Sequence, residues 1–178
     1  MLYPNQHPEQ RARDQIDNLL VAAGWQLQTK DTMNVFASAG VAVRELQTTE
    51  GPADYVLFVD GKPVGVIEAK RAEEGFRLTV HEDQTDRYRT AKIKLLDNAT
   101  PLRFAYESTG ELTRFTDYLD PKPRSRPVFA FHRPETLRRW LAEPKTLRAR
   151  LHDIPSLSPE GLRKCQFRAI NNLEASFR

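Results

Sequence analysis

The chain of 178 residues has a single cysteine and no long apolar run. Cys165 therefore has no partner for an internal disulfide, which is typical of proteins in a reducing cytosol. Charged residues interrupt the apolar runs, so we expect no segment that spans a bilayer. The first residues lack the basic and apolar regions of a secretory signal. Together these absences predict a cytoplasmic protein.

Several signatures of nucleotide and metal chemistry are also missing. A phosphate-binding loop needs serine or threonine after its Gly-Lys pair, but Gly61-Lys62 is followed by Pro63. We therefore expect no ATP hydrolysis by this chain. The histidines are scattered, and none stands at zinc-ligand spacing with Cys165. No Ser/His/Asp arrangement for nucleophilic catalysis is recognisable either.

The net charge of +3 conceals an uneven distribution along the chain. Residues 1–120 contain 14 Lys and Arg against 19 Asp and Glu, a net charge of −5. Residues 121–178 contain 13 Lys and Arg against 5 Asp and Glu, a net charge of +8. Such asymmetry indicates an anionic partner for the C-terminal part, although charge alone does not identify that partner.

The N-terminal half predicts one helix followed by strands. Residues 8–24 begin with a proline suited to a first helical turn, continue with apolar residues at helical spacing, and end on a glycine cap. Residues 41–46 predict the first strand. Residues 54–59 and 64–70 predict a hairpin around the Asp60-Gly61 turn. Both hairpin strands are almost continuously apolar, which predicts a sheet covered on both faces.

The second half predicts further helices and strands. The expected elements are a polar helix at residues 79–96, a hairpin of residues 102–107 and 112–117, a short strand at 128–131, a helix at 134–141 and a last amphipathic helix from Ser158 onward. The order is therefore α-β-β-β-α-β-β with helical material after it. The last helix reaches Arg178 without a capping signal, so we expect this chain to be a piece of a larger protein.

Charged residues on the apolar hairpin strands are the main candidates for chemistry. Burying a carboxylate costs several kcal/mol unless a cation or hydrogen-bond donors compensate it. Asp54 and Glu68 would be compensated by Mg²⁺, which prefers one or two carboxylates and leaves its other positions to water and phosphate oxygens. Lys70 shares a strand face with Glu68, where it can orient water and stabilise developing charge during phosphodiester hydrolysis. Alternatively, Asp54 caps a turn, and the other two residues pair with partners at the solvent edge.

The register of the hairpin tests this metal hypothesis. A plain two-residue turn at Asp60-Gly61 pairs Val59 with Lys62, and this register places Asp54 and Glu68 on opposite faces. A shared metal ion therefore requires a longer loop, a β-bulge or irregular pairing near Asp54.

The segment Gly51–Lys70 closely resembles the nuclease core of type I restriction enzyme motor (R, or HsdR) subunits, which belong to the PD-(D/E)xK superfamily. The resemblance extends over nearly the whole chain. Further matching segments are Arg44-Glu45, Gln84 with Tyr88 in a Gln-x-x-x-Tyr pattern, Phe104–Tyr106 with Gly110-Glu111, Phe131–Glu135, and Leu162–Ile170, which resembles the glutamine motif that opens the ATPase motor of helicase-like translocases.

This resemblance implies an α/β fold, an αβββαβ core with helices flanking a mixed sheet. It implies that Asp54, Glu68 and the backbone carbonyl of Ala69 bind Mg²⁺ and that Lys70 is the catalytic lysine. Gln84 and Tyr88 would assist DNA engagement or cleavage, and Glu9 matches a position where related nucleases often have another acid. On residue pattern alone, Gln84 and Tyr88 are an ordinary polar pair on an exposed helix, and Glu9 is a solvated glutamate in a first helical turn.

The resemblance also implies the biological setting. The chain would comprise an endonuclease domain at residues 1–150, then a linker and first helix at residues 151–178 that lead into an ATPase motor. ATP would be used only by the full-length subunit. Double-stranded DNA would be cleaved after translocation, together with methylase and specificity subunits. The basic C-terminal segment would contact either DNA or the motor.

Two other functions stay open at this point. The nuclease fold could be retained without catalysis, as a module that docks onto the motor or onto DNA. The chain could also be a stand-alone RecB-like nuclease, although the motor-like segment around Gln166 argues against that alternative.

Overall fold

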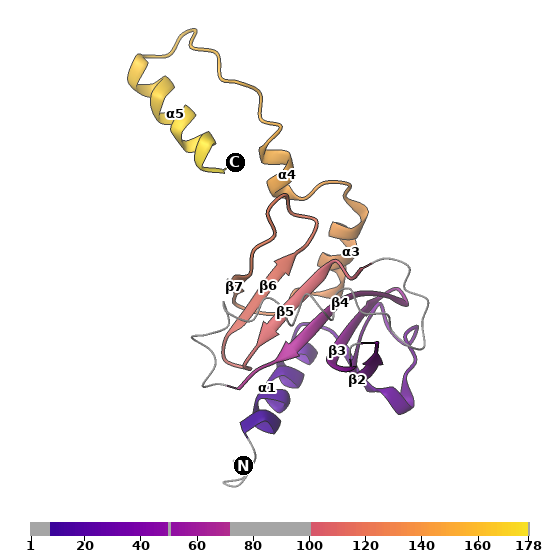
Figure 1. Ribbon diagram of the computed structural model, residues 1–178. Helices are drawn as coiled ribbons and strands as arrows, with labels where there is room; N and C mark the ends of the chain where they lie inside the picture. The colour runs from indigo at the N-terminus through magenta and orange to yellow at the C-terminus, as the bar shows by residue number, and fades with distance from the viewer. Residues whose placement is uncertain (1–7, 50, 72–100, 178) are drawn as a thin grey trace.

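The computed structural model describes residues 8–49, 51–71 and 101–177 (Figure 1). In these residues the helices are α1 (Pro8–Ala22), a 3-10 helix η1 (Lys30–Thr32), α3 (Pro134–Ala142), α4 (Leu147–Leu151) and α5 (Lys164–Phe177). The strands are β1 (Gln26–Thr29), β2 (Gly40–Thr48), β3 (Gly51–Val59), β4 (Lys62–Ala69), β5 (Phe104–Ser108), β6 (Thr113–Asp117) and β7 (Arg126–Val128).

The strands form one mixed sheet in the order β1-β2-β3-β4-β5-β6-β7. The β1–β2 and β4–β5 pairs are parallel, and the other neighbouring strands are antiparallel. A parallel pair requires a crossover connection between its strands. The helix predicted at residues 79–96, which would supply the crossover from β4 to β5, lies outside the described residues. The α/β class and the mixed sheet agree with the fold predicted from the sequence.

Helix α1 forms because its apolar side chains fall on one face. Ala12, Ile16 and Leu20 are buried against the sheet, as helical spacing predicts. Gly24 follows the helix with φ of 88°, a left-handed conformation that a glycine adopts without steric cost. The predicted start and cap of this helix are both confirmed.

The sheet is buried on both faces, as the apolar hairpin strands predict. Along β3, Tyr55 and Leu57 belong to a core cluster that includes residues of α1 and α3. Val56 and Phe58, which alternate with them, belong to a second cluster on the opposite face. The continuous apolar sequence of β3 is therefore explained by burial on both sides.

Three predicted boundaries in the chain are wrong. The first strand is β1, a polar edge strand parallel to β2, and not the segment 41–46 that lies inside β2. The final strand is Arg126–Val128, because those residues pair with β6 before the chain leaves the sheet and buries Phe131 in the core. The last helix begins at Lys164, since Gly161 adopts φ of 74° and interrupts the predicted helix.

Helix α4 was not predicted from the sequence. It is only five residues long, and the side chain of Thr146 caps it by accepting a hydrogen bond from the Ala149 N–H at 3.1 Å. Helix α3, by contrast, begins at Pro134 as predicted and ends one residue later than expected, at Ala142. Figure 1 shows α5 beyond α4, away from the central strands of the sheet.

Candidate active site

A β-bulge in β4 determines which residues face each other across the hairpin. Near the turn, Val59 pairs with Lys62 and Phe58 with Pro63, which is the register of a plain two-residue turn. The register then shifts between Leu57 and Phe58, so that Leu57 pairs with Gly65 and Val64 is the extra residue. The irregularity that a shared metal site requires is therefore present.

The shifted register brings the two candidate carboxylates onto one face. Tyr55 pairs with Ile67 in this register. If this register is continued by one residue along each strand, Asp54 falls opposite Glu68, and directly opposed residues of an antiparallel pair point to the same face. The side chains of Asp54 and Glu68 are only 15% and 13% exposed. The hairpin thus holds two nearly buried carboxylates next to each other.

Asp54 is fixed by contacts with both α1 and β4. Its Oδ1 accepts a hydrogen bond from the Nη2 of Arg13 at 2.6 Å, and its Oδ2 accepts one from the backbone N–H of Ala69 at 2.9 Å. The second bond ties the carboxylate to the end of β4, where Glu68 and Lys70 lie. Asp54 is therefore held between a helix and the neighbouring strand, and it does not cap a turn.

Lys70 and Glu68 form an ion pair on the same face of the chain, as the period of two predicts. The Nζ of Lys70 lies 3.2 Å from the Oε1 of Glu68, and both side chains are nearly buried. The backbone N–H of Lys70 donates to the Ser108 carbonyl at 2.8 Å, which fixes the end of β4 against β5. The lysine is thereby kept beside the carboxylates, and the alternative of partners at a solvent edge does not describe this pair.

Burial and repulsion both act on Glu68. Burial raises the pKa of the Glu68 carboxyl, the charge of Asp54 raises it further, and Lys70 partly offsets these effects. A bound cation would stabilise both carboxylates in their charged form. The two hard oxygen donors thus fit Mg²⁺, which takes one or two carboxylates and completes its coordination with water or phosphate.

Sequence reasoning missed a third acid, Glu107. The parallel register of β4 and β5 pairs Glu68 with Glu107, which is buried, and the charge of Glu107 also raises the pKa of Glu68. A lone carboxylate in the otherwise uncharged strand Phe104–Ser108 was a usable signal. Among the described residues, no group of three or more His, Cys, Asp or Glu side chains is placed to hold a metal ion.

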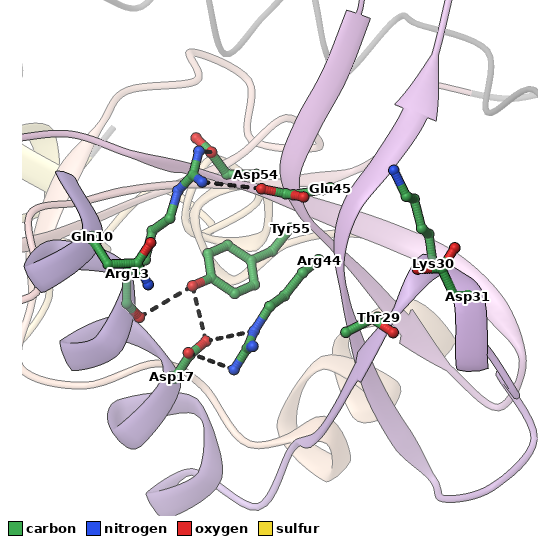
Figure 2. A pocket seen from close by; sticks show the side chains of 10 residues that line it. All are labelled: Gln10, Arg13, Asp17, Thr29, Lys30, Asp31, Arg44, Glu45, Asp54 and Tyr55. Carbon is green, nitrogen blue, oxygen red and sulfur yellow. Dashed lines mark hydrogen bonds and ion pairs between the residues drawn. The ribbon is translucent and has the colours of Figure 1, made fainter.

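Sequence reasoning also missed Arg13, for which the sequence carries no signal. Arg13 stands 41 positions before Asp54, and only the packing of α1 brings the two together. Arg13 lies at the edge of a cavity of about 220 Å³ that adjoins Asp54 (Figure 2). The side chains around this cavity are mostly charged: Gln10, Arg13, Asp17, Thr29, Lys30, Asp31, Arg44, Glu45, Asp54 and Tyr55.

A hydrogen-bond network anchors the floor of this cavity. The hydroxyl of Tyr55 donates to the Oδ1 of Asp17 at 2.9 Å, and the Nε of Arg44 donates to the same oxygen at 3.0 Å. Burial raises the pKa of the Tyr55 hydroxyl, and the charge of Asp17 raises it further, so the tyrosine stays protonated. The network joins α1, β2 and β3 immediately beside Asp54 (Figure 2).

The other predicted site residues are less fully described. Glu9 lies in the first turn of α1, and its side chain is outside the described part of the chain. Gln84 and Tyr88 fall entirely outside the described residues. Ala69 contributes its N–H to Asp54, and the metal-binding role of its carbonyl stays a prediction.

None of the helices described in the structure is long and apolar enough to cross a membrane.

Some arginines of the C-terminal part are engaged in ion pairs. Arg126 and Arg148 both contact the buried carboxylate of Asp120, at 3.1 Å and 3.0 Å. These two arginines therefore stabilise the fold beside the sheet.

Comparison with known proteins identifies a relationship in sequence. Over an alignment of 221 residues, the chain is 29% identical to the type I restriction enzyme EcoKI endonuclease subunit of Escherichia coli K12. The alignment covers 93% of this chain and 18% of that subunit, so the chain spans about a fifth of the length of its relative. The comparison with solved structures found no match to this chain.

The match to a protein family covers the strands that carry the site. Residues 34–124 match the family described as the type I restriction enzyme R protein N terminus. This range includes β2, β3, β4, β5 and β6, and with them Asp54, Glu68 and Lys70. The chain belongs to the family of type I restriction enzyme R protein N-terminal domains.

Proposed function

We propose that this chain is a Mg²⁺-dependent endonuclease domain that hydrolyses phosphodiester bonds of double-stranded DNA. One observation supports the proposal above all. The bulge at Val64 shifts the register of the hairpin so that Tyr55 pairs with Ile67, and the continuation of this register places Glu68 across from Asp54. A hairpin without a chemical role has no need to place two nearly buried carboxylates side by side, because their repulsion and desolvation oppose folding.

In the proposed reaction Asp54 and Glu68 would hold the metal ion, and the carbonyl of Ala69 would be a further ligand. When bound, Mg²⁺ would polarise a phosphoryl oxygen and lower the pKa of a coordinated water. Lys70 stands 3.2 Å from Glu68, where its ammonium group orients the attacking water and stabilises the charge that develops on the phosphate. The hydrogen bond from the Ala69 N–H keeps Asp54 oriented toward β4. Gln84, Tyr88 and Glu9 would support DNA engagement or cleavage.

The wider setting is also part of this proposal. Residues 1–150 would form the nuclease domain, and residues 151–178 would lead into an ATPase motor. In the full enzyme, cleavage would follow ATP-driven translocation and require methylase and specificity subunits. The isolated chain would then cut weakly and without sequence specificity, because other parts of the enzyme would recognise and deliver the DNA.

Calorimetric titration with Mg²⁺ tests the proposal independently of cleavage. The wild-type chain is expected to take up Mg²⁺ at millimolar concentration, and Asp54→Asn to abolish that uptake. Asp153→Asn is the matched control, because Asp153 is exposed and pairs with Lys145 in the C-terminal part, outside the matched range. If the wild type took up no Mg²⁺, even with DNA present, the proposal would fail. The chain would then be interpreted as a non-catalytic docking module.

A further inference from the structure

The guanidinium of Arg13 bridges two carboxylates at the edge of the candidate site. Its Nη2 donates to the Oδ1 of Asp54 at 2.6 Å, and its Nη1 donates to the Oε1 of Glu45 at 3.1 Å. Figure 2 shows Arg13 reaching from α1 toward both acids. A single cation thus neutralises charge on both Asp54 and Glu45.

The backbone of Arg13 is held in place by the packing of α1. Ala12 and Ile16, on either side of it along the helix, are buried. The Arg13 carbonyl lies 3.2 Å from the Tyr55 hydroxyl and shares its one proton with Asp17, the nearer acceptor. The side chain itself is 37% exposed and borders the cavity of about 220 Å³. A fixed backbone with a partly solvated, flexible side chain allows the guanidinium to move while the helix stays still.

The partner at the other end of the bridge differs from Asp54. Glu45 is 56% exposed and adopts φ of 52°, a left-handed conformation that glutamate rarely adopts. The two neighbours of Glu45 in β2 are paired with β3: Arg44 pairs with Tyr55, and Leu46 pairs with Ala53. Glu45 therefore lies across from Asp54 in the β2–β3 pair. Glu45 is therefore an exposed carboxylate that can keep the arginine after Asp54 has released it.

From this arrangement we propose that Arg13 is a positioning residue that competes with the divalent cation for Asp54. Metal binding moves the guanidinium wholly onto Glu45. The inference rests on the proposed function, because it assigns Asp54 to a metal ion. A divalent cation on Asp54 would stand within a few ångströms of the guanidinium, and two cations at that distance repel each other. The bridge to Glu45 lowers the cost of releasing Arg13, since a partner for its charge is already in contact.

Arg13 therefore lowers the affinity of the site for the metal ion, compared with the affinity that the carboxylates of Asp54 and Glu68 would have without it. A purely structural ion pair makes the opposite prediction. If the bridge only held Asp54 in position, its removal would misorient the carboxylate and weaken metal binding. The sign of the change in metal affinity separates these two roles.

Titration of the 178-residue chain with Mn²⁺ and Mg²⁺, followed by calorimetry, measures that sign. Arg13→Gln is expected to lower the Kd for Mn²⁺ roughly three- to tenfold, the range of a partly screened charge pair. Arg11→Gln removes the same charge from an exposed position two residues away on α1, and it is expected to change the Kd less than twofold. Unchanged or weaker binding by Arg13→Gln, with its fold intact by circular dichroism, would overturn the proposal.

A double-mutant cycle with Glu45 tests the second half of the inference. Glu45→Gln removes the alternative partner, so Arg13 should compete more strongly for Asp54 and the Kd should rise about threefold or more. In an Arg13→Gln background, the same substitution should have less than half of that effect. If Glu45→Gln changed the Kd equally in both backgrounds, Glu45 would act only through its own charge. The Arg13 guanidinium would then not move onto Glu45 when metal binds.

The experiment also separates this inference from the proposed function. If the wild type binds metal and Asp54→Asn does not, the metal site stands, and the Arg13 variants decide the inference alone. If the wild type binds no metal, the proposed function fails, and the inference about Arg13 fails with it.

Discussion

The hydroxyl of Tyr106 lies 2.7 Å from the Nδ1 of His132, and this pair joins β5 to the segment that precedes α3. The imidazole is surrounded by aromatic rings, with the centroid of Phe115 at 4.5 Å and that of Trp140 at 4.8 Å. Burial lowers the pKa of His132, so the folded protein keeps the ring neutral at pH values where an unfolded chain protonates it. The pair therefore links folding stability to pH.

We predict that the protein loses stability as the pH falls below about 6.5, the usual pKa of histidine in an unfolded chain. Below that value the unfolded state binds a proton that the folded state does not, and one such proton costs up to about 1.4 kcal/mol per pH unit. Urea unfolding at pH 7.5, 6.5 and 5.5 measures the slope. His132→Gln should flatten it. A slope that persisted in His132→Gln would assign the proton to another group.

The core beneath α3 gives a second prediction. Leu137 is fully buried between the helix and the sheet, whereas Leu141, four residues later, is 40% exposed. Leu137→Ala should lower the free energy of unfolding by about 2–5 kcal/mol, because it leaves a cavity in the core. Leu141→Ala removes the same atoms and should cost less than about 1 kcal/mol. Chemical denaturation measures both variants, and equal losses would contradict the packing of α3.

A buried ion pair next to Trp140 gives a third prediction. Arg103 donates two hydrogen bonds to Asp117, each at 2.8 Å, and a third to the Trp140 carbonyl at 2.6 Å. Asp117→Asn should cost about 3–5 kcal/mol, because it leaves a buried guanidinium without its counter-ion. Asp153→Asn breaks an exposed pair with Lys145 and should cost about 0–1 kcal/mol. The midpoint of thermal unfolding distinguishes them, and a small loss in Asp117→Asn would show that water can replace the pair.

Opposite effects on metal binding should distinguish Glu68 from Lys70. Glu68→Gln removes a proposed ligand and should abolish Mg²⁺ uptake in calorimetry. Lys70→Gln removes a neighbouring cation, so uptake should be retained or strengthened, while any nicking of supercoiled plasmid should fall on the order of a hundredfold or more. Loss of Mg²⁺ uptake in a folded Lys70→Gln variant would instead indicate that the lysine holds the carboxylates in position.

The hairpin was predictable because its signals are local. Residues Asp60 and Gly61 adopt φ of 49° and 76°, as the Asp-Gly turn predicts. The apolar strands on either side of the turn are buried on both faces, as their composition predicts. The need for an irregular register also followed from counting residues. Its position did not, because a bulge at Val64 depends on pairing with β3 and on the close approach of β5 to Gly65.

The contacts of the site were less predictable because they join distant parts of the chain. Arg13 reaches Asp54 only after α1 has packed on the sheet, and no local pattern marks that contact. Glu107 could have been noticed as a charge in a buried strand, but its place beside Glu68 requires the parallel β4–β5 register. Strand β1 was missed because a short polar edge strand lacks the apolar alternation by which strands are predicted.

The bulge at Val64 has a consequence for how relatives of this chain can differ in length. Asp54 and Glu68 are 14 positions apart, an even spacing, whereas a two-residue turn in regular pairing places only oddly spaced residues opposite each other. A relative that keeps the two-residue turn but gains or loses one residue within a strand between its two acids must therefore also change its bulges, or it will turn one carboxylate to the opposite face. As long as the turn keeps two residues, insertions and deletions in these strands should accordingly come in twos, and a relative with an odd spacing should have an unbroken ladder between the same strands.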